Sequence, residues 1–461
     1  MKETSKDIIL KNIAAHKAFF STHKTKNIGF RLTQLKKLKK AIFQYQEKIE
    51  TALWKDLHKS PEEAYLTEIS IVIGEIDNHI KHLKKWAAPK KVTSSLHLIP
   101  ASSKIIYEPL GTALIVAPWN YPFQLLINTL VGAISSGCCS VLKPSPDTPT
   151  VAKVMEEMIL ENFDSSYISV VHGGKETNTI LFAQRFDIIF FTGSPRVGKV
   201  VMKAAAENLT PVVLELGGKS PCIVDADANI DIAAKRIIWG KLINAGQTCI
   251  APDYLFAHES IKAELLDKIA ENIKLMYGDD IDDIKQSRFY PRIVNEDAVE
   301  RLSGLLNEGT IHTGGEIDMK EKFIAPTIID NVQPDFKIMQ AEIFGPILPV
   351  MSFSHINETI DYINKNEKPL AFYYFGKNKN AKDVLAKTSS GGACINDTLM
   401  HVSNHHLPFG GVGNSGLGNY HGQYSFFAFS HKRAVVTNPT WIDLPLKYIP
   451  FKYFNIIKKL L

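Results

Sequence analysis

Apolar residues in the first 85 positions of the chain recur at the spacing of an α-helix. Leu32, Leu35, Leu38 and Ile42 fall on one face of such a helix, with lysines at positions 36, 37, 39 and 40 between them. A run of this kind is typical of an amphipathic helix that packs on a core and turns its charges to solvent, and binding to a membrane surface is the alternative. We therefore expect residues 5–85 to be helical.

Beyond residue 110 the pattern alternates between strand and helix. Strand-like runs at 113–117, 140–142, 168–171 and 188–192 are separated by helix-like stretches at 123–136, 150–162, 176–184 and 197–208. This spacing predicts βαβ units, hence an α/β fold with a parallel sheet covered on both faces. Ligands of such sheets bind beyond the carboxyl ends of the strands, which is where Lys143, Gly193 and Glu215 fall.

A second series of βα signals begins at residues 222–224. Asp227 or Asn229 can cap a helix that runs to about residue 242, and Gly246 suits the left-handed end of that helix. Further strand candidates lie at 254–257, 326–329, 347–353 and 372–375. They predict a second α/β domain.

Residues 89–109 have the spacing of extended strands. Val92, Leu96, Leu98, Ile105 and Ile106 flank turn residues at 100–103, which predicts a long hairpin. An extended hairpin with this many apolar residues needs a surface to lie against, and a partner subunit is a candidate. We expect a homodimer.

No charged residue lies between Glu108 and Lys143, a length that suggests a membrane span. Prolines, glycines and several polar residues interrupt this stretch, whereas a lipid-facing span needs a continuous run of about 20 predominantly apolar residues. We therefore interpret it as a buried strand, loop, helix and strand of a soluble core.

Composition narrows the class of protein. A chain of 461 residues with 45% hydrophobic and 22% charged residues is long enough for two or three domains with a large core. The net charge of +5 is mild and scattered, which argues against nucleic acid as the main partner. Five cysteines, an odd number without metal-ligand spacing, indicate no metal site and a reduced, cytoplasmic compartment. The first 20 residues show no signal peptide.

Cys249 lies in a turn of small residues, positions 244–252, between a helical and a strand-like pattern. A cysteine reacts as its thiolate, which a helix end or a basic neighbour can stabilise. The alternative is a small buried hydrophobic residue. Glu215 and Asn120 stand in apolar or glycine-rich settings, and a nucleophile, a carboxylate and an amide donor are the groups that acyl chemistry needs.

The segment from Gly193 to Val200 is close to a phosphate-binding P-loop. Val200 stands where that loop needs a serine or threonine for Mg²⁺, which disfavours a nucleotide triphosphatase. A loop that leads a helix N-terminus onto a pyrophosphate fits the glycines at 193 and 198, and so does a plain strand-to-helix turn. Glu215, about 20 residues further on, fits a ribose ligand, a partly desolvated base or a structural ion pair.

Five motifs occur together in the chain: Pro-Trp-Asn at 118–120, Leu-Glu-Leu-Gly-Gly-Lys at 214–219, Gly-Gln-Thr-Cys at 246–249, Glu-Ile-Phe-Gly-Pro at 342–346 and Pro-Phe-Gly-Gly-Val-Gly-Asn-Ser-Gly at 408–416. From about residue 5 to 437 the chain resembles the aldehyde dehydrogenase superfamily, in particular its shorter class 3 branch. The resemblance implies a dinucleotide-binding domain (1–88 and 108–217), a catalytic domain (218–425), an oligomerisation hairpin and strand (89–107 and 426–437) and a tail (438–461).

The resemblance also implies a mechanism. Cys249 attacks the aldehyde carbon, while the Asn120 side-chain amide and the Cys249 backbone N–H hold the oxyanion. The hemithioacetal gives hydride to the nicotinamide and leaves a thioester, from which water activated by Glu215 releases the carboxylic acid. On this resemblance Glu215 is the base and not the ribose ligand. The short branch suggests medium- or long-chain aliphatic or aromatic aldehydes.

The resemblance implies contacts with NAD or NADP as well. On this resemblance Lys143 contacts the adenine-side ribose and Glu342 contacts the nicotinamide ribose. Gly193, Ser194 and Gly198 contact the pyrophosphate. Phe344 packs near the nicotinamide, and Trp119 lines the site. Without the motif, Glu342 is a surface acid and Phe344 a core aromatic. Many relatives carry a glutamate three residues after the lysine, but here that position is Pro146, which leaves both NAD and NADP as cofactors.

Two rival functions and two local alternatives stay open. A cysteine acyl hydrolase or acyltransferase would use Cys249 and Glu215 without hydride transfer, and a non-catalytic dinucleotide-binding protein would use neither. His405 and His406 precede the glycine-rich segment as surface histidines or as substrate contacts. We expect the basic, aromatic tail from Trp441 to Leu461 to pack on the protein, with interfacial membrane contact as the alternative.

Overall fold

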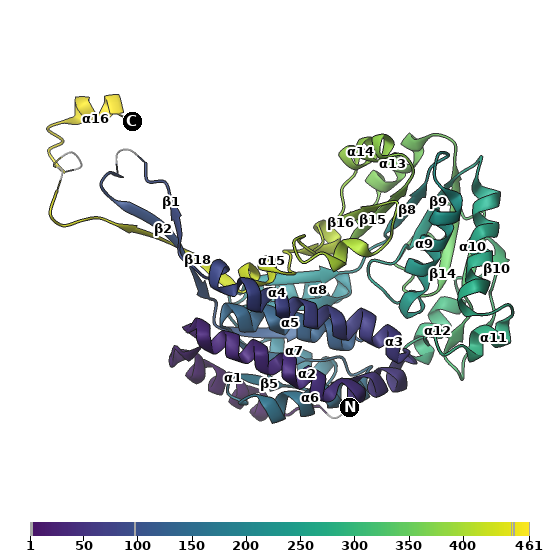
Figure 1. Ribbon diagram of the computed structural model, residues 1–461, viewed down its shortest axis with the longest axis horizontal. Coiled ribbons are helices and arrows are strands. Elements are labelled where there is room, and N and C mark those ends of the chain that lie inside the picture. The colour runs from purple at the N-terminus through teal and green to yellow at the C-terminus, as the bar shows by residue number, and fades with distance from the viewer. Residues whose placement is uncertain (1–2, 96–97, 444, 446–447, 461) are drawn as a thin grey trace.

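The computed structural model describes residues 3–95, 98–443, 445 and 448–460. Figure 1 shows two α/β lobes side by side and an arm that projects from the first lobe. The predicted α/β fold is confirmed, and each lobe is built on its own mainly parallel sheet.

The first lobe contains a six-stranded sheet in the order β17-β7-β6-β3-β4-β5. Its strands are β3 (Thr112–Val116), β4 (Cys139–Lys143), β5 (Ile168–Val170), β6 (Ile188–Gly193), β7 (Val212–Leu216) and the edge strand β17 (Gly416–Leu417). All are parallel except β17, which pairs antiparallel with β7 and places Gly416 opposite Glu215. An edge strand from near the end of the chain thus lies beside the strand that carries Glu215.

Helices cover both faces of this sheet. One face packs on α1 (Lys6–Ser21), α7 (Lys175–Phe182) and α8 (Pro195–Ala206). The other packs on α5 (Pro122–Ser136), which is backed by α2 (Ile28–Leu57), α4 (Ser70–Trp86), α6 (Pro149–Asn162) and α15 (Gln423–Ala428). The uncharged stretch is the buried β3-α5-β4 unit, as predicted.

The second lobe contains a seven-stranded sheet in the order β10-β13-β14-β9-β8-β15-β16. Its strands are β8 (Pro221–Val224), β9 (Tyr254–His258), β10 (Thr310–Thr313), β13 (Thr327–Asp330), β14 (Ile347–Phe353), β15 (Ala371–Phe375) and β16 (Gly392–Ile395), and all but β10 are parallel. One face packs on α9 (Ile230–Leu242) and α10 (Lys262–Tyr277), and the other on α12 (Glu296–Ser303), α13 (Ile356–Lys365) and α14 (Asn378–Lys387). Short elements complete the body: α3 (Pro61–Ala64), α11 (Ile281–Gln286), β11 (Ile317–Asp318) and β12 (Phe323–Ile324).

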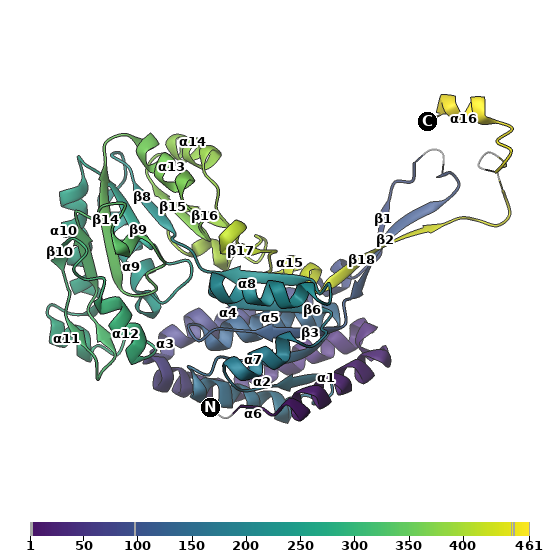
Figure 2. The same cartoon turned by 180° about the vertical axis from the view of Figure 1, so that it is seen from behind.

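The arm is a three-stranded antiparallel sheet of β1 (Lys90–Val92), β2 (Ser102–Pro109) and β18 (Ser430–Thr437). The antiparallel pairing of β1 with β2 confirms the predicted hairpin, although Leu96 lies outside the described residues. Figures 1 and 2 show the sheet projecting away from both lobes. Val92 and Val436 are exposed on it, so the arm has uncovered apolar side chains in the single chain.

We expected the tail to pack on the protein, but most of its described apolar side chains are exposed in the single chain. It ends in α16 (Phe454–Leu460), which lies near the tip of the arm in both views. Trp441 is 78% exposed and Ile449 is 82% exposed. Leu446 and Lys447 lie outside the described residues. Among the described residues, no helix has the length and apolarity needed to span a bilayer.

Candidate active site

The turn that carries Cys249 follows the end of α9. Asn229 caps this helix by accepting the Ile232 N–H at 3.0 Å, and after Leu242 the chain turns through three consecutive left-handed residues. These are Asn244, Ala245 and Gly246, with φ values of 52°, 51° and 73°. Gly246 was predicted there, but a left-handed alanine was not, because such backbone strain has no signature in sequence. The turn presents Cys249, half-buried, to the space between the lobes.

Hydrogen bonds join this turn to the loop that carries Asn120. Asn244 Nδ2 donates to Asn120 O at 2.8 Å and to Gln247 O at 3.1 Å, and Asn120 Nδ2 donates to Gln247 O at 3.0 Å. Because a carbonyl oxygen only accepts, the last bond fixes which end of the Asn120 amide is the donor. The two loops, 124 residues apart in sequence at Asn120 and Asn244, form one rigid unit.

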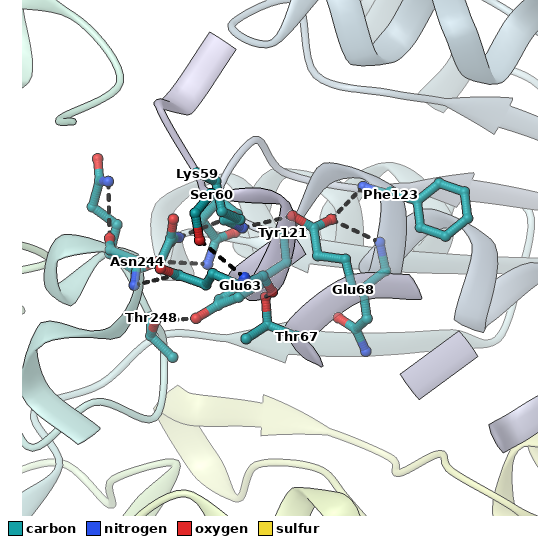
Figure 3. Close-up of polar contacts among 12 residues, drawn as sticks. Lys59, Ser60, Glu63, Thr67, Glu68, Tyr121, Phe123, Asn244 and Thr248 are labelled. Atoms are coloured by element: carbon teal, nitrogen blue, oxygen red, sulfur yellow. Dashed lines mark hydrogen bonds and ion pairs between the residues drawn. The ribbon is translucent and has the colours of Figure 1, made fainter. Parts of the chain in front are cut away.

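A buried ion pair supports the Asn120 loop from behind (Figure 3). Lys59 Nζ lies 2.6 Å from Glu68 Oε1 and 3.3 Å from Asn120 O, and both charged side chains are fully buried. Glu68 Oε2 accepts the backbone N–H groups of Phe123 and Gln124 in the first turn of α5, at 2.9 and 3.1 Å. Each charge is thus paired and further hydrogen-bonded, as a buried pair requires.

Glu63 and Tyr121 brace the cysteine turn from the same side (Figure 3). Glu63 Oε1 accepts the Asn244 N–H at 2.8 Å, and the Tyr121 hydroxyl lies 2.6 Å from Thr248 Oγ1. Burial raises the pKa of Glu63 to about 7. The sequence analysis missed these residues and the Lys59–Glu68 pair. Their one sequence signal is that Tyr121 and Thr248 directly adjoin Asn120 and Cys249.

A cavity of about 700 Å³ opens between the lobes and brings most of the predicted site residues together. Its lining includes Trp119, Asn120, Gly193, Ser194, Glu215, Cys249, Glu342 and Phe344. Lys143 and Gly198 lie elsewhere: Lys143 is the buried last residue of β4, and Gly198 packs against Leu216 inside the first turns of α8. Ser194 caps α8 by accepting the Val197 N–H, so the N-terminus of α8 opens beside the cavity.

Two carboxyl groups in the cavity have unfilled acceptors. Both oxygens of Glu215 and Oε1 of Glu342 are buried without a hydrogen-bond partner among the described residues. Burial raises the pKa of Glu215 well above its usual value, and burial together with Asp253 raises the pKa of Glu342 to about 8. A Cβ at Gly217 would stand 2.0 Å from Glu342 Oε2, so this close approach requires glycine. Oxygens left unpaired in this way can accept hydrogen bonds from the hydroxyls of a ligand.

The charge environment of Cys249 differs from our expectation of a helix end or a basic neighbour. Burial raises the pKa of the Cys249 thiol, and the carboxylates of Glu342 and Glu215 raise it further. The backbone N–H groups of Cys249 and Ile250 act in the opposite direction. This environment therefore favours the protonated thiol of Cys249.

Aromatic rings line the cavity next to the carboxylates. Trp119 and Phe344 meet edge to face, with ring centroids 5.4 Å apart, so Phe344 is a wall of the cavity and not a core aromatic. His405 faces away: its Nδ1 lies 2.9 Å from the buried carboxylate of Glu75, and His406 is exposed. The two histidines are thus on the outer side of the loop that contributes Met400 and Val402 to the cavity.

A parallel-sheet lobe with a helix N-terminus at its carboxyl edge, facing a cysteine, an amide and two buried carboxyl groups, defines a class of dinucleotide-dependent α/β oxidoreductases. The model of the Aldehyde dehydrogenase family matches residues 1–435, and the chain belongs to this family. It is an aldehyde dehydrogenase that oxidises aldehydes to carboxylic acids with NAD or NADP, as the sequence predicted.

Close relatives agree with the class 3 resemblance. The chain is 48% identical over 456 residues to a 4,4'-diaponeurosporen-aldehyde dehydrogenase of Staphylococcus aureus, covering 98% of this chain and 99% of the relative. It is 44% identical over 432 residues to a dimeric NADP-preferring aldehyde dehydrogenase of the dog, covering 94% and 95%. The solved structure of Staphylococcus aureus AldH in a substrate-bound state superposes with a TM-score of 0.95 at 47% identity, covering 98% and 99%.

Proposed function

We propose that the chain oxidises aldehydes through a thioester on Cys249, with Asn120 and Glu215 as the other two catalytic residues. The observation that carries this proposal is that the three side chains, from three distant segments, line one cavity. The sulfur of Cys249 gives its proton to the Glu215 carboxylate, which passes it to solvent, and bonds to the aldehyde carbon. The carbonyl oxygen becomes an oxyanion. One N–H of Asn120 Nδ2 is held by Gln247 O, and the other is available to this oxyanion together with the Cys249 backbone N–H.

A bound nicotinamide would supply the hydride acceptor for the former aldehyde carbon, and Cys249 then holds the acyl group as a thioester. Glu215 takes a proton from water, whose oxygen attacks the thioester carbon and breaks its bond to sulfur. The product acid departs and Cys249 is restored. The raised pKa of Glu215 makes its ionised form a stronger base, and the fraction of that form increases with pH.

The residues on the carboxyl edge of the first sheet fit a dinucleotide. Glu342, with a buried oxygen that lacks a partner among the described residues, would accept hydrogen bonds from the nicotinamide ribose. Trp119 and Phe344 would flank the ring, and the α8 N-terminus with Gly193 and Ser194 would bind the pyrophosphate. Lys143 would hold the adenine-side ribose. The position of Gly198 supports a packing role between α8 and β7.

We propose medium- or long-chain aliphatic or aromatic aldehydes as substrates. The cavity lining is largely apolar, and its side chains include Leu66, Ile71, Leu125, Trp239, Ile243, Phe289, Leu399 and Val402. Such a wall binds an apolar chain through burial of its surface. The aldehyde named for the Staphylococcus relative is one candidate.

An aldehyde panel tests the function directly. Absorbance at 340 nm should grow with NAD or NADP and should grow fastest with apolar aldehydes of increasing length. Growth with short polar aldehydes alone would contradict the substrate class. No increase in absorbance with either cofactor across the panel, together with hydrolysis of a thioester or ester substrate, would favour the rival cysteine acyl hydrolase.

We also propose a cytoplasmic homodimer that associates through the arm. The proposed domains are 1–88 with 108–217, 218–425, the arm segments 89–107 with 426–437, and the tail 438–461. The five cysteines are free, and Val436 is 51% exposed on the arm. Val436→Asp should shift the mass measured by light scattering from dimer to monomer, and an unchanged mass would contradict an interface there. The tail's exposed aromatic residues leave membrane contact as the secondary proposal, tested by flotation with vesicles.

A further inference from the structure

The first described residues of the chain lie across the carboxyl edge of the first sheet. The Thr4 N–H donates to His172 O at 2.9 Å, and the His172 N–H donates to Thr4 Oγ1 at 2.9 Å. These two bonds fix the segment on the loop between β5 and α7. The side chain of Glu3 is thereby directed to the N-terminus of α7.

The Glu3 carboxylate accepts hydrogen bonds from the donors at that helix end. Its Oε1 accepts the Gly174 N–H at 2.8 Å, and its Oε2 accepts the Thr177 N–H at 3.1 Å and the Thr177 hydroxyl. The hydrogen bond from the Thr177 side chain, followed by the one from Gly174, lowers the pKa of Glu3. A carboxylate therefore stands where free N–H groups and the helix dipole favour an anion.

Lys143 belongs to the same neighbourhood. It ends β4, which pairs with β5, and the Val171 N–H donates to Leu142 O at 2.9 Å across the two strand ends. Burial lowers the pKa of Lys143 to about 8, and the carboxylates of Glu3 and Asp147 act against this shift. Lys143 Nζ carries three N–H groups when protonated, and among the described residues it donates one hydrogen bond, to Pro144 O at 2.9 Å.

We propose that Glu3 selects NAD over NADP by occupying a ready-made phosphate site. Two backbone N–H groups, one hydroxyl and a nearby ammonium group form a suitable donor set for the 2′-phosphate of NADP. With Glu3 bound there, that phosphate meets a carboxylate and must displace it, whereas the 2′-hydroxyl of NAD is neutral. A carboxylate near this ribose favours NAD in other dinucleotide folds for the same reason. The inference rests on the proposed function, which puts the adenine-side ribose at Lys143.

A structural role alone would look different. If Glu3 serves only as a cap for α7, its removal lowers stability and changes both cofactors' affinities in the same proportion. The ratio of the dissociation constants of NADPH and NADH separates the two cases, because that ratio cancels a general loss of fold.

The experiment measures this ratio by fluorescence titration of the full chain with NADH and NADPH. Glu3→Ala should lower the ratio of the NADPH dissociation constant to the NADH dissociation constant about tenfold, because the phosphate of NADPH then replaces the carboxylate at these donors. Glu3→Gln should give a smaller decrease, because the amide oxygen can still accept a bond. Glu207→Gln, an exposed acid at the far end of α8, removes the same charge and should leave the ratio unchanged. A ratio within about twofold of the parent in Glu3→Ala would overturn the inference.

Lys143→Met separates this inference from the function on which it rests. Weaker binding of both cofactors in Lys143→Met, with an unchanged ratio in Glu3→Ala, would keep the proposed cofactor site and reject the role of Glu3. Unchanged binding of both cofactors in Lys143→Met would reject the placement of the ribose and the inference with it. Circular dichroism of each variant confirms that the compared chains are folded.

Discussion

The two walls of the cavity are built differently. On the wall of Asn120 and the cysteine turn, hydrogen bonds run from the Lys59–Glu68 pair to the carbonyl of Gln247, and the side-chain atoms of Asn120 and Asn244 without a partner among the described residues are neutral amide oxygens. The second wall is the part of the lining that carries Glu215 and Glu342, whose buried carboxyl groups have oxygens that lack partners among the described residues. The first wall holds atoms that must not move during attack. The second keeps acceptor capacity that a ligand or a water molecule can use.

The difference shows how free energy is distributed over the site. A buried network whose polar groups are hydrogen-bonded is rigid. Burial raises the pKa of an unpaired carboxyl group, and the fold is destabilised when that group ionises. Variants of the first wall should therefore change the rate of covalent chemistry. Variants of the second should change proton transfer, ligand affinity and the response to pH.

The largest effect is expected from loss of the nucleophile. Cys249→Ala removes the only atom proposed to bond to the aldehyde carbon, so turnover should fall by more than about 10⁴-fold. Cofactor binding should survive, because the carboxylate wall is intact. Absorbance at 340 nm and NADH fluorescence measure the two quantities, and measurable turnover would reject Cys249 as the nucleophile.

Glu215→Gln should separate the two chemical steps. One equivalent of reduced cofactor should appear in a burst, and steady turnover should then fall by about 10²–10⁴-fold, because water lacks a base. In the parent chain the rate of acid release should rise with pH as Glu215, with its raised pKa, becomes ionised, and this rise should be lost in the variant. Glu342→Gln is the matched control in the same cavity. A steady rate equal to that of the parent would place the base elsewhere.

Asn120→Ala tests the hydrogen-bonded wall. Loss of one donor to the oxyanion should lower kcat by about 10²–10³-fold, with no burst of reduced cofactor at the parent rate. Stopped-flow absorbance resolves this first step. An unaltered burst rate would mean that Asn120 serves the structure and not the oxyanion.

The smallest effect is expected on stability. Folded Glu342 keeps its proton up to a pKa of about 8, while the unfolded group releases it near 4.5, so the folded chain binds more protons between these values. Stability must then fall as pH rises through this window. Without cofactor, the melting temperature of Glu342→Gln should fall less than that of the parent between pH 5 and pH 8. An equal decrease of the melting temperature with pH in the two chains would contradict the assigned pKa of Glu342.

Local patterns predicted the fold well. Strand and helix signals anticipated the β3-α5-β4 unit and most strands of the second sheet, because periodicity reflects which face of each element is buried. The resemblance to a family identified Cys249, Glu215 and Asn120, and the structure brings them to one cavity. Their catalytic roles stay predictions.

Long-range contacts could not be predicted. Lys59 lies in a lysine-rich region and looks like any solvated lysine, yet it is buried against a loop 61 residues away. Glu3 looks like a terminal charge, and its partner Thr177 is 174 residues distant. The exposed tail was also misjudged, since an aromatic sequence indicates apolar surface and not what covers it. In each case the missing information is a tertiary contact, which one sequence does not encode locally.

The pairing of Gly416 with Glu215 has a consequence for biosynthesis. The strand that holds the proposed base is flanked on one side by β17, which leaves the ribosome two hundred residues later than β7 (416 minus 215 is 201). When Cys249 has been translated, the nascent chain therefore still lacks β17, the edge strand that pairs with the strand of Glu215. Strand β17 is translated after every other strand of the two lobe sheets, so ribosome-bound intermediates have an incomplete reaction centre.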